Sequence, residues 1–250
     1  MRTIRLVSFG FVAVAACMYA ALSSQEEFQT VRCGLGPPPG TSEFAAFNAR
    51  RDAEVQRVGY ETVCEANLAR YDIGLGLLPA AVVLSSLDFR PVDLAATPFN
   101  SFPSVATVAE TVSGVRSRLY RSFKMPDGHI LTLFEDDMSA DGTHVYRKPE
   151  DEPERVNGLP ARLDVLQAPG GKAVSFISWV ESRRSYELWL DANVVLEKRK
   201  TQLFALASSI PKSIPARTDE PQSAPVKLGP DGMPVFPEPP QFIRTPGDQR

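Results

Sequence analysis

The stretch from residue 156 to residue 210 constrains the fold most, because its pattern predicts two β-hairpins followed by a helix. Asn157-Gly158 is a turn sequence, and apolar residues then occupy every second position from 161 to 165, as in a half-buried strand. Pro169-Gly170-Gly171 predicts a reversal, because proline pre-sets φ and glycine accepts positive φ. Residues 173–180 are apolar at both parities, which is typical of a central strand covered on both faces.

The turn at residues 182–185 decides the register that we predict for the second hairpin. With the first and last of these residues opposite each other, Trp179 lies opposite Leu188 and Ile177 lies opposite Leu190. One face of the hairpin then carries a continuous apolar patch, which is what a buried sheet face requires.

The hairpin before it is compatible with two registers. A two-residue turn places Leu163 and Val165 opposite Phe176 and Val174, on the sheet face that does not carry Ile177. A bulge would shift the register by one residue and place Leu163 and Val165 on the same sheet face as Ile177. The sequence leaves this choice open.

A helix is expected after the hairpins, over residues 195–210. Asp191 or Asn193 can accept hydrogen bonds from the amides of its first turn, and Pro211 ends it. Leu196, Leu203, Ala207 and Ile210 fall on one stripe of this helix, which we expect to pack on the sheet.

The region before residue 156 completes an α+β prediction for a single domain over residues 41–210. We expect helices within 41–88, among them one capped by Thr41 or Ser42 and one that begins at Pro79. Residues 89–94 suggest an edge strand, and residues 98–111 a loop. An antiparallel sheet of hairpins is expected over 113–191, with the alternating strand 115–125 as its first member.

The N-terminal segment, residues 1–23, has the features of an export signal. Arg2 and Arg5 precede an uncharged apolar run from residue 6 to residue 22. Val14-Ala15-Ala16-Cys17 resembles the bacterial lipobox, in which the cysteine is lipidated, and we take Cys17 as the lipidation site. Two alternatives stay open: ordinary cleavage after Ser23, which releases a secreted protein, and an uncleaved membrane anchor. All three place the protein in the cell envelope, on the periplasmic side of a membrane, or beyond it.

Two cysteines remain after the signal, Cys33 and Cys64. In an oxidising compartment they are expected to form a disulfide, and closing a loop of this length stabilises a fold by roughly 3–4 kcal/mol on the chain-entropy model. The alternative is two buried free thiols. Residues 24–40 end in a Gly/Pro-rich run and are predicted to be a linker.

Motifs for chemistry are mostly absent, so we predict no catalytic residue, no metal site and no cofactor. The chain contains no Walker loop, HExxH, CxxC or GxSxG. Residues 137–142 match the first half of a calcium loop, but Lys148 stands where the loop requires a carboxylate. The net charge of −3 gives no support for a nucleic-acid partner. Residues 211–250 are rich in proline and are predicted to be a disordered tail, with Pro234-Val-Phe-Pro237 shaped as a polyproline recognition site.

Four segments resemble the extracytoplasmic module of transmembrane anti-sigma factors. They are Gly158-Leu-Pro-Ala161, Gly171 to Trp179, Tyr186-Glu-Leu-Trp189 and Leu203 to Ile210. The resemblance implies a small α+β domain on the outer side of a membrane. Members of that family carry a cytoplasmic sigma-binding domain ahead of the membrane segment, and almost nothing precedes the apolar run here, so the resemblance does not extend to a regulatory role.

The sequence therefore predicts a non-catalytic envelope protein, attached to a membrane by its N-terminus, that binds an unidentified envelope partner. A small exported hydrolase without a recognised motif is one alternative. A periplasmic immunity or inhibitor protein is another.

The mass of the protein from its native membrane fraction tests the N-terminal predictions. A chain that begins at a diacylated or triacylated Cys17 is expected, with Cys33 and Cys64 open to alkylation only after reduction. A chain that begins at Ser24 or at Met1 would refute the lipidation. Alkylation of both thiols without reduction would refute the disulfide.

Overall fold

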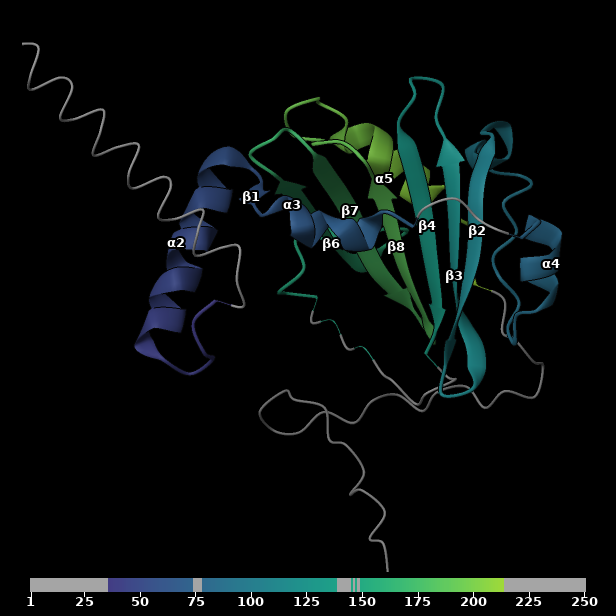
Figure 1. The fold of residues 1–250 in the computed structure, drawn as a ribbon, viewed down its shortest axis with the longest axis horizontal. Helices are drawn as coiled ribbons and strands as arrows, with labels where there is room; N and C mark the ends of the chain where they lie inside the picture. Colours follow the sequence, from purple (N-terminus) through teal and green to yellow (C-terminus); the bar gives the residue numbers. More distant parts are fainter. Residues whose placement is uncertain (1–35, 74–77, 139–144, 146, 148, 214–250) are drawn as a thin grey trace, which may run out of the picture.

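The computed structural model describes residues 36–73, 78–138, 145, 147 and 149–213. They form an α+β fold in which an eight-stranded sheet carries a few short helices (Figure 1). The predicted fold class is confirmed. The helical elements are α2 (Ser42–Val58), α3 (Glu65–Leu68), η1 (Ala69–Tyr71), α4 (Ala80–Ser85), η2 (Pro98–Ser101) and α5 (Lys200–Ser208). The strands are β1 (Glu61–Thr62), β2 (Ser104–Val112), β3 (Val115–Lys124), β4 (Ile130–Asp137), β5 (Glu154–Val156), β6 (Leu159–Gln167), β7 (Ala173–Glu181) and β8 (Arg184–Leu190).

The strands follow the order β1-β6-β7-β8-β4-β3-β2, and β5 pairs with β6 beside β1. Every pairing is antiparallel except that of β1 with β6, so the sheet is mixed. β7 and β8 lie in the middle, and the central place of β7 agrees with its apolar residues at both parities.

The two faces of the sheet are covered differently, and this difference positions the site. The face with Leu131, Ile177 and Leu188 is covered by α5 and by residues 89–102, and it forms the main core. We call it the closed face. The other face, here called the open face, is crossed in front by α3 and η1, as Figure 1 shows.

A buried ion pair on the closed face fastens residues 89–102 to the sheet. Arg121 of β3 forms an ion pair with Glu135 of β4, whose side chain is 1% exposed. The Val92 amide donates to Glu135 Oε2 at 2.9 Å, and Arg121 Nη2 donates to the Val92 carbonyl at 3.1 Å. The ion pair and these hydrogen bonds compensate most of the cost of burying the two charges, although Arg121 Nε has no hydrogen-bond partner among the described residues.

The predicted register of the second hairpin is wrong by two residues. Trp179 lies opposite Tyr186 and Ile177 opposite Leu188, so the side chains keep the predicted face but change partners. The turn consists of Ser182 and Arg183 because Arg184 belongs to β8, where its guanidinium pairs with Asp137 Oδ2 of β4 at 2.6 Å.

The first hairpin adopts the shifted register. Leu163 lies opposite Ile177, and Val165 lies opposite Ser175. This register places the side chains of Leu163 and Val165 on the closed face. A five-residue connection, closed by Ala168 N–H to the Lys172 carbonyl at 2.8 Å, produces this shift in place of a bulge.

The closing helix is shorter than predicted. Asn193 caps a single turn, and its Oδ1 accepts from the amides of residues 195 and 196. Lys198 then takes a positive φ of 56°, which interrupts the helix, and α5 begins at Lys200. Leu196 is consequently 60% exposed, whereas Leu203 is fully buried.

The N-terminal half also departs from the prediction. Thr41 caps α2 as expected, since its Oγ1 accepts from the Phe44 amide at 3.1 Å, but no residue of α2 is buried. Residues 89–94 form no strand and instead pack on the closed face. The antiparallel part of the sheet starts at Ser104, because β2 lies where we predicted a loop.

Two predicted segments cannot be compared with the structure. The N-terminal signal and most of the 24–40 linker precede the described residues, and the proline-rich tail beyond Ser213 follows them. The described part of the chain contains no helix that is both long and apolar enough to span a bilayer.

The buried ion pair gives a stability prediction. Arg121→Met leaves the Glu135 carboxylate buried without its cation, which should lower the unfolding free energy by roughly 3–5 kcal/mol. Replacing both residues, as Arg121→Met with Glu135→Leu, should recover most of this loss. Urea unfolding of the two variants measures both values.

The exposed ion pair of Lys200 and Glu154 is the matched control. The Lys200 side chain is 51% exposed, so Lys200→Met should change the unfolding free energy by less than about 1 kcal/mol. Equal losses from Arg121→Met and Lys200→Met would contradict the stabilising role of the buried pair.

Candidate functional site

A row of aromatic side chains crosses the open face of the sheet. Tyr120, Phe134, Trp189 and Phe176 come from β3, β4, β8 and β7 and alternate with the core residues of the same strands. Successive rings are in contact: Tyr120 and Phe134 have centroids 4.7 Å apart, and Phe134 and Trp189 6.1 Å apart. All but Trp189 are partly exposed, so the row borders solvent.

Residues 61–73 add the fifth ring and hold it above the sheet. β1 pairs with the edge of β6, and the buried side chains of Val63 and Leu68 fix the following turns. Tyr71 then stacks on Phe176 at 5.3 Å and meets Trp189 edge-on at 5.0 Å, with the two ring planes at 89°. The two rings touch at nearly a right angle and form an aromatic corner in the cavity wall, which we call the notch.

A cavity of about 470 Å³ lies beside this notch, between residues 68–73 and the sheet. Apolar side chains supply most of its wall, among them Leu68, Tyr71, Ile73, Ile130, Val174 and Trp189. Its volume falls within the range of pockets that hold small ligands or a partner's anchoring side chains.

The polar part of the cavity contains a hydroxyl pair. Ser122 Oγ and Thr132 Oγ1 lie 2.9 Å apart, and each residue is 4% exposed. One hydroxyl donates to the other, so the pair keeps one O–H donor without an acceptor among the described residues. Lys172 stands at the mouth, exposed, and its ammonium group pairs with no carboxylate in the described ranges. The cavity therefore offers donors to an incoming oxygen atom.

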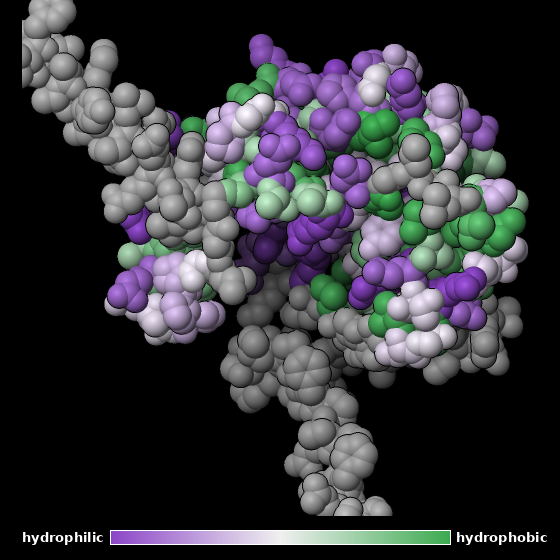
Figure 2. Space-filling view, viewed as in Figure 1, coloured by the Kyte–Doolittle hydropathy of each residue, from purple (hydrophilic) through white to green (hydrophobic). Residues whose placement is uncertain are grey.

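A polar recess lies on the other side of α3. Figure 2 shows a hollow there that is lined mainly by hydrophilic residues. Along these strands, Arg162 lies opposite Ser178, and Ser178 opposite Glu187. Arg147 joins them by donating to Ser178 Oγ at 2.8 Å, and Glu152 accepts from Arg162 Nε at 3.0 Å. Charges of both signs thus adjoin the aromatic row.

Arg118 of β3 lies on the same side of its strand as Tyr120 and forms separate ion pairs. Its guanidinium lies 3.5 Å from Asp136 and 3.6 Å from Glu110, both on neighbouring strands. The charge of Arg118 is therefore balanced by two carboxylates, as on an ordinary solvated sheet face, and this favours such a face over an anion-binding site.

Asp164 is the unpaired acidic group of the open face. It lies opposite Phe176 and makes no hydrogen bond or ion pair with any described residue. Burial raises the pKa of its carboxyl; the charge of Arg162 acts against this increase, and that of Glu61 acts with it.

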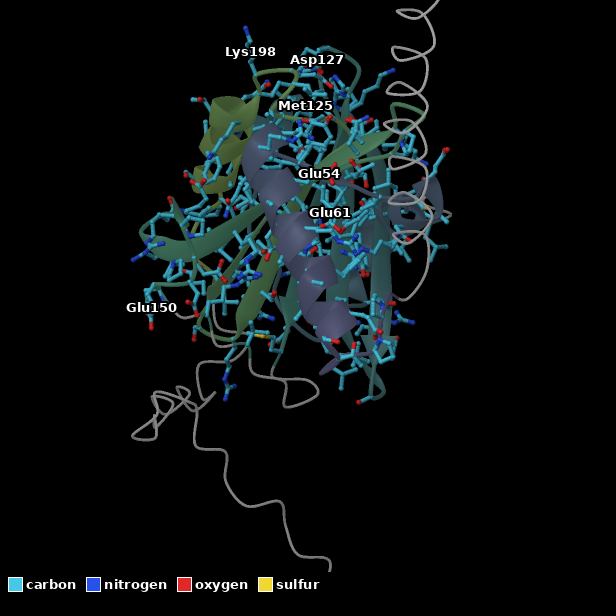
Figure 3. All side chains as sticks on the ribbon, turned by 90° about the vertical axis from the view of Figure 1, so that its left-hand side faces the viewer. Glu54, Glu61, Met125, Asp127, Glu150 and Lys198 are labelled. Atoms are coloured by element: carbon cyan, nitrogen blue, oxygen red, sulfur yellow. The ribbon has the colours of Figure 1, made fainter. Side chains whose placement is uncertain are left out.

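The described residues contain no arrangement typical of catalysis. The hydroxyl pair has no histidine beside it, and His129 Nδ1 instead contacts Asp191 Oδ1 at 2.8 Å. Its other nitrogen lies 3.3 Å from Glu197. Asp127 and Lys198 lie at this same end of the molecule, and Glu150 lies at the opposite end (Figure 3). His129 thus joins the β3–β4 turn to the segment before α5.

The sequence-predicted site residues are only partly visible. Cys64 stands at the N-cap of α3, close to the site, while Cys17 and Cys33 lie outside the described residues. The disulfide and the lipidation therefore stay predictions. Asp137 of the half calcium loop pairs with Arg184, and Lys148 is not described. No cluster of metal-ligating side chains occurs among the residues that were placed.

Comparison with protein-family models, with curated proteins and with solved structures finds no match to this chain. The site must therefore be interpreted from its own residues.

The sequence prediction missed this site. Trp179 lies on the same side of β7 as Ile177, whereas Trp189 lies on the side of β8 opposite to Leu188 and Leu190. This alternation was a signal in the sequence that the Trp189 indole faces away from the main core. Tyr71 gave no such signal, because residues 60–70 carry no clear periodicity and its ring contacts come from residues more than a hundred positions away.

The raised pKa of Asp164 gives a pH prediction. The folded chain holds this proton more tightly than the unfolded chain, whose aspartate pKa is about 3.9. The contribution of Asp164 to stability is therefore greatest below that value and falls as the pH rises through the folded-state pKa. Relative to Asp164→Asn, the wild-type chain should lose unfolding free energy as the pH rises from below about 3.9 through the raised folded-state pKa. Thermal unfolding across this range measures the difference, and the opposite trend would contradict the assignment.

Proposed function

We propose that this protein is a non-catalytic binding module of the bacterial cell envelope, attached to a membrane by its N-terminus. We propose further that it binds an envelope partner in the aromatic cavity of the open face. The observation that carries the proposal is the cavity of about 470 Å³ with Tyr71 and Trp189 in its wall, in which the hydroxyls of Ser122 and Thr132 bond each other and not a base among the described residues.

The cavity suits the anchor of a protein or peptide partner. Interface hot spots are apolar or aromatic side chains that fill a pocket at the centre of a contact, with polar groups around them. Here the apolar wall accepts the anchor, and the hydroxyl pair of Ser122 and Thr132 can donate to a backbone carbonyl. The charged residues beyond α3 provide a polar rim.

The proposed location depends on the N-terminal sequence. The basic start, the apolar run and the cysteine at position 17 are the support for export and for attachment to a membrane. The fold is compatible with this location, because α2 begins at Ser42, directly after the predicted linker, and leads into β1 of the sheet.

Site-specific photo-cross-linking in cells tests the proposal. We expect a photoreactive residue at Val105, which lines the cavity, to cross-link to one discrete envelope protein. The same residue at Glu150, exposed at the opposite end of the molecule, is the matched control and should give no such product.

A second variant separates binding from mere proximity. Trp189→Ala removes one wall of the notch and should lower the yield of the Val105 product several-fold, while the fold persists by circular dichroism. Cross-linking that is equal from Val105 and from Glu150, or that survives Trp189→Ala unchanged, would contradict the proposed site.

A further inference from the structure

The notch formed by Tyr71 and Trp189 has the chemistry of a polyproline site. Proline-rich segments dock between aromatic rings, and because their backbone makes no internal hydrogen bonds, their carbonyls need donors from the binding surface. The two rings meet at 89°, and the hydroxyl pair beside them retains a donor. The Trp189 Nε1 proton is already used, since it goes to Glu187 Oε2 at 2.7 Å, so the hydroxyl pair is the natural donor.

The chain itself contains a segment with this chemistry. Pro234-Val-Phe-Pro237 has the PxxP spacing, and Phe236 supplies an aromatic anchor. Glu238 follows it directly and has the charge opposite to that of Lys172, which lines the cavity together with Asp72 and Asp191. The segment lies beyond the residues that the structure describes, and these properties are those of its sequence.

The chain between Ser213 and Pro234 is long enough to span the distance from the end of the domain to the cavity. The Ser213 amide donates to Glu181 Oε2 at 2.8 Å, at the end of β7, and Ala173 at the start of β7 lines the cavity. Eight steps along the strand span about 26 Å. The 21 residues from Ser213 to Pro234 reach about 65 Å when fully extended as polyproline and average about 25 Å as a flexible coil. A tether whose length matches the span gives the highest effective concentration.

We infer that residues 234–237 occupy the cavity of their own chain and compete there with the partner. This inference rests on the proposed function, because it assigns the same cavity. A partner must displace the tail, so the intramolecular contact lowers the apparent affinity by the fraction of chains in which the cavity is filled.

Photo-cross-linking of the purified full-length chain tests the inference. A photoreactive residue replaces Lys172, and the monomeric product is mapped by mass spectrometry at low protein concentration. We expect cross-links to residues 230–244 of the same chain. Phe236→Ala should lower their yield several-fold, and a free peptide of residues 230–244 should then cross-link in its place. The matched control Phe242→Ala changes an aromatic residue of the same tail outside the PxxP spacing and should leave the yield unchanged.

Three results would overturn the inference: no product with residues 230–244, a product formed only between two chains, or equal losses from Phe236→Ala and Phe242→Ala. Cells that carry the Val105 cross-linker distinguish this failure from failure of the proposed function. If the partner product appears there while the tail product is absent, the cavity binds a partner and only the tail inference fails. If both products are absent, the proposed function fails as well.

Discussion

Two-sided burial of the central strands is the constraint on which the rest of this structure depends. In β7 and β8 one set of side chains, with Ile177 and Leu188, packs under α5, and the other set, with Phe176 and Trp189, faces residues 61–73. The first set is mostly apolar, and the second combines the apolar Phe176 and Trp189 with the polar Ser178 and Glu187. Leaving the apolar part of either face to water costs about 25 cal/mol per Å². α5 and residues 89–102 pack on the closed face. On the open face, residues 61–73 cover part of the aromatic row, Arg147 contacts Ser178, and the cavity lies between residues 68–73 and the sheet.

The fold class was predictable because local signals agreed with the final structure. Asn157-Gly158 takes the two positive φ values that its turn requires, and the alternation over 115–125 became β3. Register was less predictable. The turn at 182–185 depends on Arg184, whose partner Asp137 lies on another strand, and a local reading cannot see that ion pair. The same holds for Lys198, which breaks the closing helix, and for β2, whose partner strand fixes residues that looked like a loop.

The site was harder to predict than the fold because its parts come from distant segments. Tyr71, Ser122 and Trp189 meet only after β1 has paired with β6 and the strand order has brought β3 near β8. Non-local contacts of this kind leave no periodicity in the sequence. The cavity adds one feature to the sequence-based proposal of a binding protein: an apolar wall lies beside the hydroxyls of Ser122 and Thr132 and the charged groups of Asp72, Lys172 and Asp191.

Amide hydrogen exchange of the full-length protein, purified alone and in complex with whatever partner co-purifies from native membranes, tests the central claim most directly. The account predicts that binding slows exchange of backbone amides in residues 68–73, at the start of β7 and at the end of β8, and leaves α5 and α4 unchanged. Protection centred on α5 or on the free edge of β2 would place the partner elsewhere and contradict the claim that the open-face cavity is the binding site.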